Sequence, residues 1–164
     1  MNKKAIIIII TAIVVLLGAM VWGYSRMAGP TQAQLSQQSS LTASTTLYDF
    51  GTISMANGTV DHKFPIVNPT DQDITITNLQ TSCMCTTAYI GDGGSRQGPF
   101  GMPGMGGVTA ASFVIPAHST QNVDVIFNPA AHGPAGIGDI DRTIDVTQQG
   151  GGTLQLEIKA VVTP

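Results

Sequence analysis

The chain has 164 residues and a formal net charge of −3, and only 10% of its residues are charged. Three of its seven basic residues precede position 49, so the remainder carries four basic and ten acidic side chains, a balance of 4 − 10 = −6. Affinity for nucleic acid comes largely from Lys and Arg that neutralise phosphates, and this chain has no basic patch with interleaved aromatic residues, so the composition excludes nucleic acid as a partner.

The N-terminal segment is typical of a membrane anchor. Residues 5–23 are apolar and uncharged. A helix of that length, at ~1.5 Å per residue, covers roughly the ~30 Å hydrocarbon core of a bilayer. Two lysines precede the run, Trp22 and Tyr24 lie at its other end, and only one positive charge follows, which favours an inside N-terminus. A cleaved signal peptide is the alternative, but its apolar region is usually shorter and a small-residue cleavage site should follow. We therefore predict an uncleaved signal anchor over residues 1–24.

The predicted anchor places the rest of the chain outside the cytoplasmic membrane, in a periplasmic or extracellular location. Residues 25–46 are rich in Ser, Thr, Gln and Ala and nearly free of charge and bulky apolar side chains. Such a segment cannot bury enough surface to offset the entropy of ordering it. We predict a flexible stalk that holds a domain away from the membrane.

From residue 47 the pattern changes to short alternating apolar runs separated by turn residues, and no 3.6-residue apolar period appears. The runs span residues 47–50, 60–67, 74–79, 111–116, 122–129, 142–147 and 153–162, with one more directly after the cysteines. This spacing predicts an all-β domain over residues 47–164, an antiparallel β-sandwich of about seven to eight strands. Because Pro65 lacks an N–H group, its strand is expected at a sheet edge or at a bulge.

One segment breaks the alternation. Residues 91–107 contain eight glycines and two prolines in 17 positions. Loops of this length without structure are usually either functional or disordered. We favour disorder, and we expect Met102 and Met105 to be ordinary loop residues more readily than ligands.

Four motifs follow one another in the predicted β domain: YDFGTI, HKFPIVNPT, ITITNLQTSCMCT and VIPAHSTQNVDVIFNP. Their order resembles a widespread family of bacterial envelope domains of unknown function. The resemblance extends over residues 47–162, and its most specific parts are DFG, the Asn68 turn and Cys-x-Cys-Thr. It implies an Ig-like sandwich related to pilus-chaperone, major-sperm-protein and hydin-type domains. The chain departs from the family at Met84, where a glycine is usual, and in the glycine-rich insertion. The resemblance supports the fold rather than a function.

Cys83 and Cys85 are the two cysteines of the chain and lie two positions apart. On a regular strand their Cα atoms would be ~6.5–7 Å apart, whereas disulfides span ~4.4–6.8 Å. A disulfide therefore requires a bent backbone, which Met84 makes harder than glycine would. Such a bridge would be strained and readily reduced, although export favours oxidation. Structural thiols or a local disulfide, a metal site, and a redox or attachment site all stay open.

The metal alternative rests on two thiolates that share one face of a strand. Thiolate and thioether ligands select Cu(I), and no other cofactor is expected. The candidate ligands are Cys83 and Cys85 with Met102 and Met105, and further sulfur or nitrogen could come from Met84, His118 and His132. The pattern falls short of a zinc signature because it has no second Cys-x-Cys or His-x-His.

Catalytic motifs are not evident, so we do not expect an enzyme. A Cys–His nucleophile from either cysteine with His118 or His132 is the one conceivable arrangement. The leading hypothesis is a membrane-anchored binding or scaffolding module with a protein partner in the cell envelope, presenting loops or the edge strand that contains Pro65. The alternative is a copper-binding or thiol-redox protein that uses Cys83 and Cys85.

Overall fold

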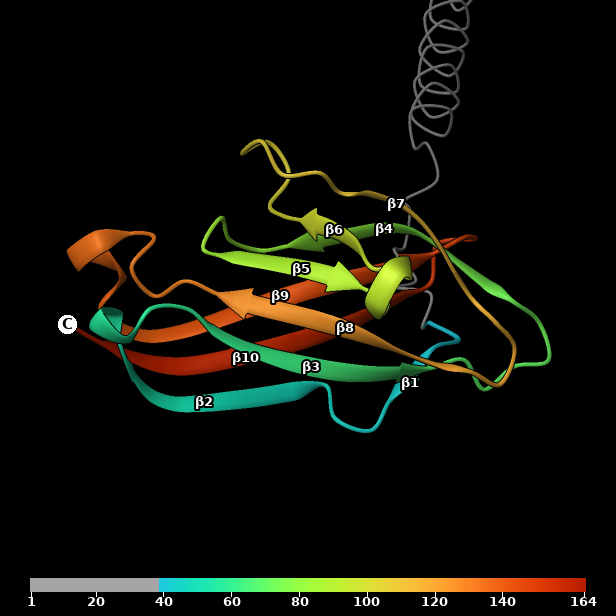
Figure 1. Cartoon of the computed structure of the whole chain (residues 1–164), viewed down its shortest axis with the longest axis horizontal. Coiled ribbons are helices and arrows are strands. Elements are labelled where there is room, and N and C mark those ends of the chain that lie inside the picture. The colour runs from blue at the N-terminus through green and yellow to red at the C-terminus, as the bar shows by residue number, and fades with distance from the viewer. Residues whose placement is uncertain (1–38) are drawn as a thin grey trace, which may run out of the picture. The chain divides into compact units, whose positions relative to one another are not determined.

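The computed structural model describes residues 39–164. This part of the chain forms a β-sandwich of two five-stranded sheets with three short 3-10 turns, as shown in Figure 1. The predicted all-β sandwich is therefore confirmed. Within residues 39–164 no helix is long and apolar enough to span a membrane. The predicted anchor, residues 1–24, lies outside the described residues, as does most of the predicted stalk.

The two sheets have the strand orders β1-β3-β8-β5-β6 and β2-β10-β9-β4-β7. The strands are β1 (Thr42–Ala43), β2 (Leu47–Ser54), β3 (Val60–Val67), β4 (Ile74–Thr81), β5 (Thr86–Ile90), β6 (Gln97–Phe100), β7 (Ala110–Ile115), β8 (Thr120–Phe127), β9 (Gly138–Gln148) and β10 (Thr153–Thr163). The 3-10 turns are η1 (Met55–Asn57), η2 (Gly93–Ser95) and η3 (Gly133–Gly136).

The described part of the chain has ten strands rather than the seven to eight expected, and β1 and β6 are the additional ones. β1 has two residues and β6 contains a glycine and a proline, so neither shows apolar alternation. The sandwich is also not wholly antiparallel, because β2 pairs in parallel with β10. The chain passes from one sheet to the other after β1, and β2 then runs beside the last strand in the same direction.

Alternating apolar residues of both sheets meet between them and form one core. Its largest fully buried side chains include Phe64, Ile66, Ile76, Leu79, Ile90, Ile115, Ile144, Leu156 and Ile158. These residues come from β3, β4, β5, β7, β9 and β10, and Val123 and Val125 of β8 join them. This is the expected result of period-2 patterning in a sandwich with one buried face per sheet.

The fold begins earlier than residue 47, the expected end of the stalk. Leu41 is buried in the core at 2% exposure. The Ser39 hydroxyl donates a hydrogen bond of 2.9 Å to Oε1 of Gln148. One apolar residue among Ser and Thr carries no periodic signal, so this part of the domain has the composition of a linker.

Strand β3 is an edge along most of its length, as Pro65 predicts. β1 pairs only with Ile66 and Val67. The stretch from Val60 to Pro65 therefore has β8 on one side and no strand on the other among the described residues. The absent N–H of Pro65 leaves no gap in a hydrogen-bond ladder there.

The glycine-rich insertion, residues 91–107, differs from the expected disordered loop. It contains η2 and β6, and Phe100 at the end of β6 is 3% exposed. Gly98 has a φ of 134°, and a Cβ there would lie 2.6 Å from the ring of Tyr89. Arg96 stacks 3.8 Å from the centroid of the same ring. A core phenylalanine and a glycine that allows close packing thus hold this segment on β5.

Side chains of β2 and β3, which belong to different sheets, form a small aromatic cluster that extends from the surface to the core. The rings of Tyr48 and His62 stack with centroids 3.6 Å apart, and Phe64 contacts His62 edge-on at 4.7 Å. Partial burial in this cluster lowers the pKa of His62 below 6.5, and the nearby Asp61 carboxylate opposes the shift. The folded protein therefore favours neutral His62.

The lowered pKa of His62 predicts an acid-sensitive contribution to stability. The unfolded chain binds a proton at His62 more readily than the folded chain, so the free energy of unfolding should fall as pH drops below 6.5. Urea unfolding at a series of pH values checks this, and His62→Gln should give a shallower decline. His118→Gln serves as the control, because His118 lies on a different loop beside Asp71. Equal slopes for the native chain and His62→Gln would contradict the prediction.

Candidate functional site

Cys83 and Cys85 form a disulfide in the connection between β4, which ends at Thr81, and β5, which begins at Thr86. Their Cα atoms are 5.2 Å apart, within the usual span of a disulfide. The expected geometry of two cysteines on one strand face is therefore wrong, because the backbone turns between them. Met84 stands at the tip of this turn and is 50% exposed rather than packed in the core.

Local hydrogen bonds explain how the chain turns without a central glycine. The backbone N–H of Thr86 donates to the carbonyl oxygen of Cys83 at 3.1 Å. The buried hydroxyl of Thr81 lies 3.0 Å from the carbonyl oxygens of both Cys83 and Thr86 and can donate to either. The N–H of Cys85 points to Sγ of Cys83 at 3.2 Å. These contacts satisfy the polar groups of the turn, so a side chain at Met84 is tolerated.

The turn is also fixed to two other strands. Ser82 donates from its N–H to the carbonyl of Thr143 in β9 at 3.0 Å and accepts from the N–H of Thr143 at 2.9 Å. On the other side, the N–H of Asn128 donates to the carbonyl of Cys85 at 2.9 Å. The two cysteines are therefore held where the end of β8 and the middle of β9 approach the β4–β5 connection.

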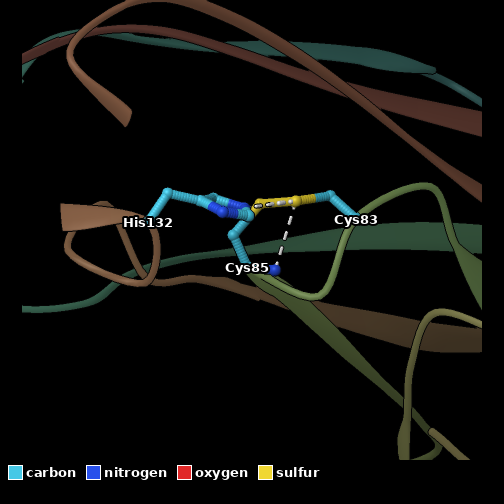
Figure 2. Close-up of side chains that lie close together, drawn as sticks. All are labelled: Cys83, Cys85 and His132. Carbon is cyan, nitrogen blue, oxygen red and sulfur yellow. Dashed lines mark hydrogen bonds between the residues drawn. A yellow bond between two sulfur atoms is a disulfide. The ribbon is translucent and has the colours of Figure 1, made fainter. Parts of the chain in front are cut away.

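Two basic side chains lie against the two sulfurs. His132, which precedes η3 on the β8–β9 connection, places Nε2 3.2 Å from Sγ of Cys83. Figure 2 shows this imidazole pointing at the sulfurs from the opposite side of the site. Arg142 in β9 donates from Nε to Sγ of Cys85 at 3.4 Å. His132 is exposed and Arg142 half-buried, whereas the cysteines are 9% and 3% exposed.

The sequence named His132 among several candidates but offered no reason to prefer it, and it missed Arg142. Both residues reach the cysteines only because β8 and β9 fold back beside the β4–β5 connection. Of the conceivable Cys–His pairs, the structure brings together Cys83 and His132. His118 lies elsewhere and contacts Oδ1 of Asp71 at 2.8 Å.

Met102 and Met105, the other predicted metal ligands, line a separate apolar groove of about 570 Å³. We call this the methionine groove; it is lined chiefly by Met84, Pro99, Phe100, Met102, Met105 and Val108. Neither cysteine forms part of its wall. Met105 and Val108 are each 59% exposed, so the groove presents apolar surface to solvent. Met84, between the cysteines, and Thr86, directly after Cys85, line the groove and join it to the disulfide turn.

The disulfide closes a loop of three residues, because the cysteines are two positions apart. In the chain-entropy model a loop this short gains about 1.6 kcal/mol, against about 3 kcal/mol for a 15-residue loop. Its contribution to stability is therefore modest. A neighbouring guanidinium favours a thiolate over a thiol, so the site is well suited to opening into two reduced sulfurs.

The fold and the site together define an Ig-like β-sandwich domain with a disulfide flanked by basic side chains. Residues 41–97 match a family described as protein of unknown function, DUF1573. The matched range runs from the start of the sandwich through the cysteine pair to the beginning of β6. The match supports the Ig-like family of unknown function that the sequence resembles. No curated protein matches the chain in sequence.

Solved structures share the sandwich at low sequence identity. A protein of unknown function from Porphyromonas gingivalis W83 aligns with 80% of this chain and 51% of its own, at 13% identity and a TM-score of 0.55. A family 123 glycoside hydrolase from Clostridium perfringens aligns over 71% and 22%, at 8% identity and a TM-score of 0.51. A PapD-like domain of human CEP192 aligns over 83% and 92%, at 15% identity and a TM-score of 0.47. The chain spans about half of the first structure, and the first two likenesses concern the fold alone.

Proposed function

We propose that this chain is a membrane-anchored, extracytoplasmic Ig-like binding module that exchanges its Cys83–Cys85 disulfide with the thiols of a protein partner in the cell envelope. The observation that carries the proposal is the pairing of each sulfur with its own basic side chain, His132 at Cys83 and Arg142 at Cys85. The apolar run of residues 5–23 supports anchoring, and disulfides persist mainly in oxidising, exported compartments.

The difference between the two sulfurs assigns them different roles. Cys83 is the more exposed cysteine, so a partner thiolate attacks Sγ of Cys83 and forms a mixed disulfide there. The bond between the two sulfurs breaks, and its electron pair goes to Sγ of Cys85. Arg142 is already oriented toward that atom at 3.4 Å and stabilises the thiolate that forms.

A second partner thiol completes the exchange. It attacks the partner's sulfur in the mixed disulfide, the partner acquires a disulfide, and Cys83 leaves as a thiolate that takes up a proton. Nε2 of His132, 3.2 Å away, is placed to carry that proton. The partner dithiol loses two electrons and two protons. The chain gains the two electrons; one proton goes to Cys83, and the other passes to solvent while Cys85 stays a thiolate beside Arg142. The reverse sequence of steps would reduce a partner disulfide.

The methionine groove supplies a place for the partner beside the reactive bond. It is apolar, it is open to solvent, and no charged side chain lines it. Its wall includes Met84, which lies between the two cysteines in the chain. A partner segment with an apolar side chain next to its cysteine could therefore occupy the groove while its sulfur reaches Cys83. Thioether side chains adapt readily to different partners.

Glutathione redox buffers test the exchange directly. The full chain is equilibrated at a series of reduced-to-oxidised ratios, alkylated, and weighed by mass spectrometry. We expect two alkylated thiols at reducing ratios, none at oxidising ratios, and full reversal between them. Cys83→Ser/Cys85→Ser is the control and should show no change in mass. A disulfide that resists reduction until circular dichroism reports unfolding would contradict the proposed function.

Location is tested separately. We expect the full chain to fractionate with membranes and to resist carbonate extraction. A membrane-impermeant maleimide added to intact spheroplasts should label the cysteines after reduction, because the domain is proposed to face outward. Labelling only after lysis would contradict the proposed orientation.

A further inference from the structure

Three ligand atoms with an affinity for soft metals converge at the disulfide. Sγ of Cys83, Sγ of Cys85 and Nε2 of His132 all lie within 4.8 Å of one another. They come from two connections that are far apart in the chain, between β4 and β5 and between β8 and β9. Among residues 39–164 this is the one group of His, Cys, Asp or Glu residues with such spacing.

We propose that the reduced form of this site binds a single Cu(I) ion through the two thiolates and Nε2 of His132. Two thiolates on one metal, with bonds of ~2.3 Å, lie about 4 Å apart. When the disulfide opens, the sulfurs must separate to about that distance, and the exposed turn at Met84 is free to widen. The proposal rests on one part of the proposed function, the reducibility of the disulfide, and is independent of any protein partner. A dithiol reductant supplies the two electrons and two protons, and binding of Cu(I) releases the protons again.

The type of ligand favours Cu(I) over Zn²⁺. The described residues offer three ligands rather than the four of a structural zinc site, so Zn²⁺ here would keep an open fourth position. Thiolates select Cu(I) because both partners are soft. None of the three ligands is a carboxylate, the group that harder cations prefer.

Charge leads to the same conclusion. Two thiolates and Cu(I) carry a net charge of −1, and the guanidinium of Arg142 next to Cys85 compensates for it. With Zn²⁺ the same ligands would form a neutral centre, which gains no charge stabilisation from the neighbouring guanidinium. The site is therefore electrostatically matched to a monovalent ion.

The proposed ligand set differs from the one the sequence indicates. Met102 and Met105 line the methionine groove, of which the cysteines form no part, so both methionines should be dispensable for the metal. His132 takes their place. This substitution makes the ligand assignment testable residue by residue.

Anaerobic titration of the reduced full chain with Cu(I), in competition with bathocuproine disulfonate, tests the site. We expect one equivalent to bind. Cys83→Ser and Cys85→Ser should each weaken binding on the order of 100-fold, and His132→Ala on the order of 10-fold. Met102→Leu/Met105→Leu and His118→Ala are the matched controls and should bind like the native chain. X-ray absorption at the copper edge should show nitrogen as well as sulfur neighbours, and the nitrogen should be lost in His132→Ala.

The outcomes separate this inference from the proposed function. A chain with two titratable thiols that binds no Cu(I), or binds it equally well without His132, overturns the copper site and leaves thiol exchange standing. Loss of binding in Met102→Leu/Met105→Leu overturns the ligand assignment. A disulfide that cannot be reduced in the folded chain overturns both proposals.

Discussion

Cys85→Ser should convert the site into a trap for mixed disulfides. Without Cys85, no internal thiol can displace a partner bound at Cys83, so an adduct formed from oxidised glutathione should persist. Cys83→Ser should form adduct at least about tenfold more slowly, because the remaining cysteine, Cys85, is the more buried residue of the two at 3% exposure. The two single variants are matched controls for each other, since each keeps one thiol of the same turn.

Mass spectrometry of the two full-length variants during incubation with oxidised glutathione measures this asymmetry. Equal adduct formation at both cysteines would show that the sulfurs are equivalent and would contradict the prediction. The same Cys85→Ser variant, expressed in cells and recovered under non-reducing conditions, should carry the envelope partner as a disulfide-linked adduct.

Arg142→Gln in the otherwise native chain should slow opening of the disulfide by reduced glutathione about tenfold, because the leaving thiolate loses its charged donor.

Asn68 should be the polar residue whose replacement lowers stability most. It is completely buried, and its Nδ2 group lies within hydrogen-bond distance of the carbonyl oxygens of Gln72, Ile115 and Pro116, at 2.8, 3.0 and 3.1 Å. Its Oδ1 accepts from the N–H and hydroxyl of Thr70. One side chain thus ties the β3–β4 turn to the end of β7.

Asn68→Asp should therefore be more harmful than Asn68→Ala, although aspartate is the closer match in shape. Aspartate places an oxygen against three carbonyl oxygens and buries a charge, for a loss of about 4 kcal/mol, whereas alanine leaves the partners unsatisfied for about 3 kcal/mol. Urea unfolding of the purified chains measures both. Asn128→Asp is the control and should change stability by less than about 0.5 kcal/mol, because Asn128 is exposed and its side chain accepts one hydrogen bond, from the N–H of Ala130, which a carboxylate also accepts. A smaller loss for Asn68→Asp than for Asn68→Ala would contradict this account of the turn.

Fold class followed from the sequence because the physical cause is local. A strand in a sandwich buries every second side chain, so runs such as residues 60–67 and 153–162 display their own burial. Pro65 indicated its edge position through a missing N–H, and the Asn68 turn was recognisable from its residues. For the same reason, segments without alternation were not predicted as strands. Leu41, β1 and β6 belong to the sandwich, although the sequence predicted a stalk and a disordered loop there.

The sequence by itself determined that two cysteines would share one short segment of an all-β domain. Tertiary structure decided the rest of the site. Local hydrogen bonds form the turn at Met84, and bonds to Thr143 in β9 and to Asn128 after β8 fix its position. Cys83 and His132 are 49 positions apart in the chain, and Cys85 and Arg142 are 57 apart. Such proximity is created by the order of the strands in the two sheets, which no local pattern encodes. Met102 and Met105 line a separate groove, because the buried Phe100 fixes their segment against the core away from the cysteines.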